Sequence, residues 1–144
     1  MPALLLVLLG TVACAPSTGP LQDPTPAAPA AVTQAAKGAI DLRVGMSAPL
    51  PGTEATLTFV RVRDDSRCPT GVTCIWEGDA VVELRMQQRT GQALTVELHA
   101  NPGFERQATA FGVTISLERL DPYPDAGTPI APDSYRLTLK IAED

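Results

Sequence analysis

Residues 64–79 read DDSRCPTGVTCIWEGD and hold two of the three cysteines and the only tryptophan of the chain. Five residues, among them Pro69 and Gly71, separate Cys68 from Cys74. Proline restricts the backbone before it and glycine permits a positive φ, so this spacing favours a tight loop. Loop-closure theory assigns a disulfide across such a loop roughly 2–3 kcal/mol. We expect one intradomain disulfide between Cys68 and Cys74, with the indole of Trp76 packed on its sulfur atoms.

Metal binding is the alternative for the same segment. Cys68, Cys74 and His99 would leave a structural zinc site one ligand short, and the cysteine spacing is not the usual one. The carboxylates in residues 64–79 could converge on calcium if the disulfide brings the two flanks together, although no EF-hand spacing is present. The calcium question stays open at this point, and we expect no metal and no cofactor.

Runs of alternating apolar and polar residues extend on both sides of this segment, which is typical of strands with one buried face. The alternation changes phase between Phe59 and Val60 and predicts a β-bulge there. No helical period of useful length follows Ile40. We predict an all-β fold, an antiparallel β-sandwich of six or seven strands, with a small β-barrel as the alternative. The expected strands cover residues 40–44, 57–62, 80–86, 94–98, 111–117 and 135–141, with 46–50 as the seventh.

The first residues are typical of an export signal. Residues 1–13 contain a short apolar run that is too short to span a bilayer. The sequence Thr11-Val12-Ala13-Cys14 resembles a bacterial lipobox, in which cleavage leaves a lipid-carrying cysteine. Lipidation of Cys14 would also leave Cys68 and Cys74 as one closed pair, whereas an odd thiol is a liability in an exported protein. The alternative is an ordinary secretory signal and a secreted or periplasmic domain without a lipid anchor.

Composition divides the rest of the chain into two parts. Residues 14–38 are rich in proline and alanine and predict a flexible tether, because they contain too little apolar surface to offset their ordering entropy. Residues 39–144 form the predicted β-sandwich domain. A tether that begins at Cys14 would anchor this domain to a membrane of the cell envelope. Ala15 follows Cys14, and in a Gram-negative host the absence of aspartate there resembles lipoproteins sorted to the outer membrane.

The net charge and the absence of known catalytic motifs argue against several classes of function. The net charge is −5 and no basic block is present, so a nucleic-acid partner is not expected. No nucleophile elbow, phosphate-binding loop or dinucleotide fingerprint occurs, and His99 is the only histidine. We therefore expect a non-catalytic binding or scaffolding module, with an envelope protein or a glycan as its partner. A carbohydrate-active or metal-dependent enzyme is the less favoured alternative.

Two motifs carry a family resemblance. The run DSRCPTGVTCIWEGDA and the later LERLDPYPDAGTPIAPDSYRLTLKI resemble a family of small, uncharacterised bacterial exported proteins, many of them lipoproteins. The shared pattern is D-S-R-C-P, a short loop, C-x-W-x-G, and a proline-tyrosine-proline loop before the last strand. It covers roughly Thr56 to Ile141. The resemblance implies a β fold and an exported location, and it implies no activity.

Two stiffened loops are the candidate binding surface. Residues 64–79 are closed by the expected disulfide, and residues 121–133 contain four prolines. We expect both loops at the same end of the domain, since loops carry binding residues on a rigid scaffold. Arg67, Glu77 and Tyr123 are predicted to be exposed there, beside a mostly buried Trp76. Arg67 is expected to pair with a neighbouring carboxylate or with an anionic group of a ligand.

Overall fold

The computed structural model describes residues 38–143 of the 144-residue chain. These residues form eight β-strands and no helix, so they contain no helix that could cross a bilayer. The predictions for Cys14, for residues 1–13 and for nearly all of residues 14–38 fall outside the described residues. The strands are β1 (Ala39–Arg43), β2 (Ser47–Pro49), β3 (Ala55–Asp65), β4 (Ala80–Gln88), β5 (Ala93–His99), β6 (Gln107–Ala110), β7 (Val113–Asp121) and β8 (Arg136–Glu143).

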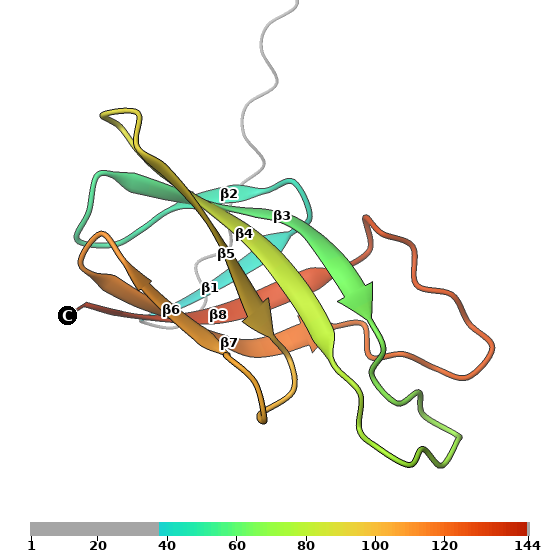
Figure 1. Cartoon of the computed structure of the whole chain (residues 1–144). Coiled ribbons are helices and arrows are strands. Elements are labelled where there is room, and N and C mark those ends of the chain that lie inside the picture. The colour runs from blue at the N-terminus through green and yellow to red at the C-terminus, as the bar shows by residue number, and fades with distance from the viewer. Residues whose placement is uncertain (1–37, 144) are drawn as a thin grey trace, which may run out of the picture.

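Two antiparallel sheets of four strands pack face to face, as Figure 1 shows. One sheet has the order β1-β8-β7-β6 and the other has the order β2-β3-β4-β5. No described strand of one sheet pairs with a strand of the other, so the structure is an open sandwich. The predicted antiparallel β-sandwich is therefore confirmed, and the barrel alternative is wrong.

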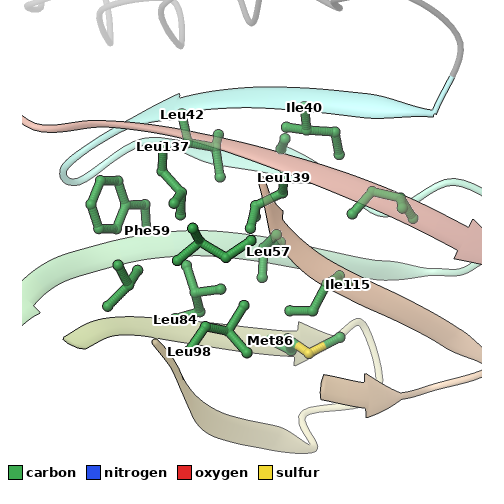
Figure 2. Close-up of a cluster of buried hydrophobic side chains, with 14 of the residues drawn as sticks. Ile40, Leu42, Leu57, Phe59, Leu84, Met86, Leu98, Ile115, Leu137 and Leu139 are labelled. Atoms are coloured by element: carbon green, nitrogen blue, oxygen red, sulfur yellow. The ribbon is translucent and has the colours of Figure 1, made fainter. Parts of the chain in front are cut away.

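The core lies between the sheets and follows the predicted alternation. Every second side chain of the long strands points inward, and those on the opposite face remain at least partly exposed. Figure 2 shows side chains of both sheets meeting in one layer. The labelled members are Leu57, Phe59, Leu84, Met86 and Leu98 from one sheet and Ile40, Leu42, Ile115, Leu137 and Leu139 from the other.

Register shifts keep this alternation compatible with the core. The β3–β4 pairing shifts between Phe59 and Arg61, so the predicted bulge is confirmed. A second shift, between Val62 and Asp64, was not predicted. It lies just before the disulfide loop, where a bulge increases strand twist and redirects the chain.

The strand count and one turn correct the sequence analysis. The expected seventh strand is β2, and β6 is an eighth strand that alternation did not reveal, because its residues Gln-Ala-Thr-Ala include no large apolar side chain. The strand predicted over residues 111–117 begins only at Val113, because Phe111 lies in the two-residue turn between β6 and β7. Its φ is 56° and that of Gly112 is 79°, both positive as a tight hairpin turn requires.

Four connections gather at one end of the sandwich, which we call the disulfide end. They are the β3–β4 loop, the β7–β8 loop, the β5–β6 connection and the β1–β2 turn. In Figure 1 the β3–β4 and β7–β8 loops extend together beyond the sheets. The β2–β3, β4–β5 and β6–β7 turns lie at the opposite end. The disulfide end therefore collects most of the long loops of the domain.

Candidate binding surface at the disulfide end

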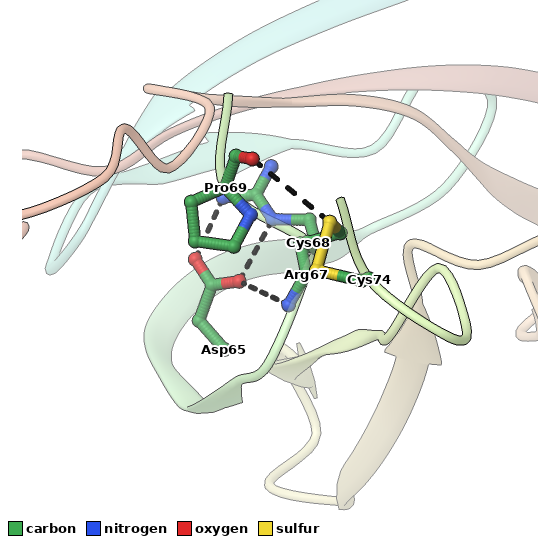
Figure 3. Close-up of a disulfide and its surroundings, with 5 residues drawn as sticks. All are labelled: Asp65, Arg67, Cys68, Pro69 and Cys74. Atoms are coloured by element: carbon green, nitrogen blue, oxygen red, sulfur yellow. Dashed lines mark hydrogen bonds and ion pairs between the residues drawn. A yellow bond between two sulfur atoms is a disulfide. The ribbon is translucent and has the colours of Figure 1, made fainter. Parts of the chain in front are cut away.

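The disulfide closes the β3–β4 loop as predicted. Cys68 and Cys74 are joined, with Cα atoms 5.9 Å apart (Figure 3). The neck of the loop is held by backbone hydrogen bonds from Ser66 N to Asp79 O (2.7 Å) and from Cys68 N to Glu77 O (2.8 Å). The two flanks of the loop thus continue as a narrow ribbon beyond β3 and β4.

Gly78 allows the two sides of this neck to approach closely. Its φ is +69°, and a Cβ atom built on it would lie 1.8 Å from the carbonyl oxygen of Ser66. Only glycine accommodates both the backbone conformation and this contact. The glycine of the C-x-W-x-G pattern therefore has a structural role at the base of the loop.

The two stiffened loops lie side by side, as the sequence analysis expected. Thr70 N donates to Pro124 O at 3.0 Å, and Ala126 N donates to Thr70 O at 3.2 Å. The hydroxyl of Thr70 adds a 2.5 Å hydrogen bond to the carboxylate of Asp125. These contacts form a short parallel bridge between Thr70 and Asp125. The disulfide loop and the proline-rich loop consequently brace each other.

Arg67 lies at the centre of the contacts between the two loops. The prediction that it is exposed is wrong. Its side chain is only 7% exposed. Nε and Nη2 donate to the two carboxylate oxygens of Asp65 at 2.8 and 2.7 Å, as Figure 3 shows, and this pairing with a neighbouring carboxylate was predicted. Nη1 donates to Leu120 O and Nη2 to Pro122 O, both at 2.8 Å. Arg67 is buried because these acceptors replace water around the guanidinium.

The same network joins the two sheets. Asp65 ends β3, whereas Leu120 belongs to β7 and Tyr135 immediately precedes β8. The hydroxyl of Tyr135 donates to Asp65 Oδ2 at 2.9 Å. Burial, together with the hydrogen bond and negative charge of Asp65, raises the pKa of Tyr135 to about 12, so this hydroxyl keeps its proton near neutral pH. The network fixes the disulfide loop to both layers of the sandwich.

A second contact holds the neck of the loop to the β5–β6 connection. Asp79 accepts a hydrogen bond from the backbone of Asn101 at 2.9 Å and pairs with His99 Nδ1 at 2.5 Å. Burial favours the neutral acid, but the hydrogen bond and charge of His99 and the amides of Asn101 and Ala80 outweigh it and lower the pKa of Asp79. Asp79 therefore remains an anion and orders this connection.

These contacts engage residues that were considered as zinc or calcium ligands. Cys68 and Cys74 are bound to each other, Asp65 is paired with Arg67, and Asp79 is hydrogen-bonded to His99. Within residues 38–143, no group of three or more His, Cys, Asp or Glu side chains is placed to hold a metal ion. Asp65 and Asp79 act here as acceptors for protein donors.

Trp76 lies on the surface, so the prediction that it is mostly buried is wrong. The indole is 64% exposed and does not belong to the core. The loop extends past the ends of the sheets, while Leu120 and Tyr135 close the core at this end. A side chain two residues after Cys74 therefore projects beyond the core and does not pack within it.

Large hydrophobic side chains gather at the disulfide end. Among the described residues six such side chains are exposed, and only Leu94 belongs to the opposite part of the sandwich. The other five define what we call the hydrophobic tip: Val72, Ile75 and Trp76 of the disulfide loop, Phe104 of the β5–β6 connection, and Tyr123 of the β7–β8 loop. Tyr123 is stacked against Arg67, whose Cζ lies 5.0 Å from the ring centroid.

The predicted surface residues relate differently to this tip. Tyr123 is exposed within it, and Glu77 is exposed beside Trp76, as expected. Arg67 is buried, and its hydrogen bonds hold the disulfide loop against the β7–β8 loop. Val72, Ile75 and Phe104 were not among the candidates, although the sequence contains a signal for the first two: a disulfide loop this short cannot enclose its own large apolar side chains.

Comparison of the chain with models of protein families, with curated proteins and with solved structures found no match.

Proposed function

We propose that this chain is a lipoprotein of the bacterial cell envelope that presents a non-catalytic binding module on a flexible tether. The lipobox-like sequence before Cys14, the odd cysteine count and the proline- and alanine-rich residues 14–38 support the placement. The lipid on Cys14 holds the chain at the membrane, at the outer membrane if the host is Gram-negative. The tether gives the sandwich lateral and vertical reach.

The hydrophobic tip supports the binding role. A soluble domain gains nothing in stability from exposed Ile75 and Trp76 side chains, and clustered exposed hydrophobic residues mark interaction surfaces. The disulfide, the Arg67 network and the Thr70–Asp125 bridge hold the disulfide loop and the β7–β8 loop, which carry four of the five side chains, in one arrangement. Such preorganisation reduces the entropy lost on binding. The placement of five of the six exposed large hydrophobic side chains of the described residues on loops of the disulfide end is the observation that carries the proposal.

An envelope protein is the partner that this composition favours. Aromatic residues such as Trp76 and Tyr123 are enriched at the centre of protein–protein interfaces, and the exposed aliphatic side chains of Val72 and Ile75 offer apolar surface that a polar sugar does not need. A glycan is the second candidate, because Trp76, Phe104 and Tyr123 supply aromatic faces on which sugar rings can stack. The two candidates differ in whether the aliphatic side chains contribute to the affinity.

Replacement of Cys14 tests the placement. We expect the Cys14→Ser variant to leave the membrane fraction, because a lipid-modified cysteine supplies the acyl chains on which stable anchoring depends. Fractionation of cells and mass spectrometry of the mature N-terminus give the readout, with Ser17→Ala as a neighbouring control that stays in the membrane. An unmodified Cys14, or a wild-type chain in the soluble fraction, would refute the lipid anchor and leave the binding surface to be tested separately.

Crosslinking from the hydrophobic tip tests the binding role. A photoreactive phenylalanine analogue at position 76 is expected to form discrete adducts with one envelope component in living cells. The same analogue at position 94 is the matched control, since Leu94 is an exposed hydrophobic residue away from the disulfide end. The Ile75→Ser, Trp76→Ser double variant should then lower the affinity for that component about 30-fold or more, as loss of an interface hot spot does.

The outcomes separate the candidates. A protein adduct whose affinity falls on Ile75→Ser alone supports a protein partner. Quenching of Trp76 fluorescence by cell-wall oligosaccharides, with no effect of Ile75→Ser, supports a glycan. Equal adducts from positions 76 and 94, or an unchanged affinity in the double variant, would show that the hydrophobic tip is not the contact surface.

A further inference from the structure

A groove crosses the outer face of the β1-β8-β7-β6 sheet, on the side of the sheet that faces away from the core. Its volume is about 920 Å³, and it lies beside Pro122 and Ser134 of the β7–β8 loop. Three arginines line it, one from each of three neighbouring strands: Arg43 of β1, Arg136 of β8 and Arg119 of β7. We call this feature the arginine groove. It is basic although the whole chain carries a net charge of −5.

The two acidic residues of the groove are already engaged. Asp121 accepts from Arg119, with Nε 2.7 Å from Oδ2. Asp41 accepts a hydrogen bond from the hydroxyl of Thr138 at 2.6 Å. Neither carboxylate forms an ion pair with Arg43 or Arg136.

Among the residues that the structure describes, Arg43 and Arg136 are therefore left without an anionic partner. They are directly opposite each other in the β1–β8 register. Like charges in such a cross-strand pair destabilise a sheet. Within residues 38–143, neither guanidinium forms an ion pair with a carboxylate, whereas Arg61, Arg63, Arg67, Arg89 and Arg119 all do. An anion placed across the two strands would relieve this repulsion.

We propose that the arginine groove binds a phosphomonoester, with the phosphate group held between Arg43 and Arg136. A phosphomonoester carries a charge of about −1.5 to −2 near neutral pH, which matches two guanidinium groups better than a single carboxylate does. Guanidinium groups bind phosphate oxygens in a bidentate manner. Arg119 is paired with Asp121, so two of the three arginines remain for the ligand.

The size of the groove indicates that the phosphate is carried by a larger molecule. Small-molecule sites usually measure about 300–1,000 Å³. Met46 and Pro122 add apolar surface at the rim, suited to the organic part of an ester. The same chemistry occurs in a soluble sugar or glycerol phosphate and in the headgroup of phosphatidic acid. The site is distinct from the hydrophobic tip and does not depend on the function proposed for it.

Titrations with matched probes test this site. We would use the mature chain from residue 14 carrying Cys14→Ser, so that neither the apolar signal segment nor a lipid anchor masks vesicle binding. Calorimetry would compare glycerol 3-phosphate with inorganic phosphate, sulfate and acetate. Flotation would compare phosphatidylcholine vesicles with and without phosphatidic acid. We expect saturable binding of a phosphomonoester, a loss of about tenfold in affinity for Arg43→Gln or Arg136→Gln, and a loss of about a hundredfold for the double variant.

Arg85→Gln is the matched control, because Arg85 is an exposed arginine of the other sheet. It should bind as the parent chain does, and all variants should keep the circular dichroism spectrum of the folded chain. Binding of glycerol 3-phosphate alone identifies a soluble ester, and binding only to phosphatidic acid vesicles identifies a lipid headgroup. Acetate or sulfate binding as tightly as the ester, equal losses with Arg85→Gln, or no saturable binding of any phosphate probe would overturn the proposal.

Discussion

Replacing Arg67 with methionine is expected to lower the free energy of unfolding by about 3–5 kcal/mol, the usual cost of removing one partner of a buried ion pair. The substitution keeps most of the volume of the side chain but leaves the carboxylate of Asp65 without its cation. It also removes the donors to the carbonyl groups of Leu120 and Pro122. Urea unfolding of the oxidised chain, followed by far-ultraviolet circular dichroism, measures the change.

Two further variants show whether burial is the cause. Arg61→Met removes the exposed ion pair with Glu83 and should cost less than about 1 kcal/mol. Adding Asp65→Asn to Arg67→Met should recover part of the loss, because the buried unpaired charge is then gone while Tyr135 keeps a hydrogen-bond acceptor. A cost for Arg67→Met as small as that of Arg61→Met would contradict the assigned role of the network.

The Gly78→Ala substitution is expected to destabilise the chain by about 3 kcal/mol or more. The new Cβ would lie 1.8 Å from the carbonyl oxygen and 2.6 Å from the carbonyl carbon of Ser66, and both atoms belong to the backbone. Relief therefore requires the two sides of the loop neck to separate. Overpacking of this kind costs about 1–3 kcal/mol or more, and the positive φ adds about 1–2 kcal/mol. Thermal or urea unfolding under non-reducing conditions gives the measurement.

Gly71→Ala separates these two contributions within the same loop. Gly71 has φ +84°, and a Cβ atom there would have no described atom within 4 Å apart from those of its neighbours in the chain. It should therefore show the conformational cost alone, about 1–2 kcal/mol. Equal losses at positions 71 and 78 would mean that the close approach between Gly78 and Ser66 does not constrain the loop.

The opposite environments of Arg67 and Trp76 show where sequence reasoning about the site fails. An arginine in a polar loop is usually exposed and a tryptophan near a disulfide is usually buried. Arg67 is buried because Asp65 is adjacent in the chain and the carbonyl groups of Leu120 and Pro122 are adjacent in space. Only the first of these acceptors is visible in the sequence. The other two lie more than 50 residues away along the chain and are brought to Arg67 only when the two sheets pack together.

The missed strand has a related explanation. Periodicity detects a strand when its buried side chains are large, and β6 offers only Ala108 and Ala110 to the core. Its place is fixed by pairing with β7 at the edge of the sheet, from Gln107 opposite Ser116 to Ala110 opposite Val113. The alternation predicts a strand residue at Phe111 for the converse reason, because Phe111 is a large apolar residue next to an alternating run.

The sequence by itself determined the elements whose cause is local. Alternation specified the long strands and their buried faces, the phase change at Phe59 specified a bulge, and the spacing of Cys68 and Cys74 specified a closed loop. The tertiary structure alone decided what depends on partners distant in the chain. It paired β1 with β8, buried Arg67 between the two sheets, exposed Trp76 beyond their ends and placed Arg43 opposite Arg136. Periodicity acts over neighbouring residues, whereas burial of a loop side chain depends on acceptors and neighbours that only the assembled sheets bring together.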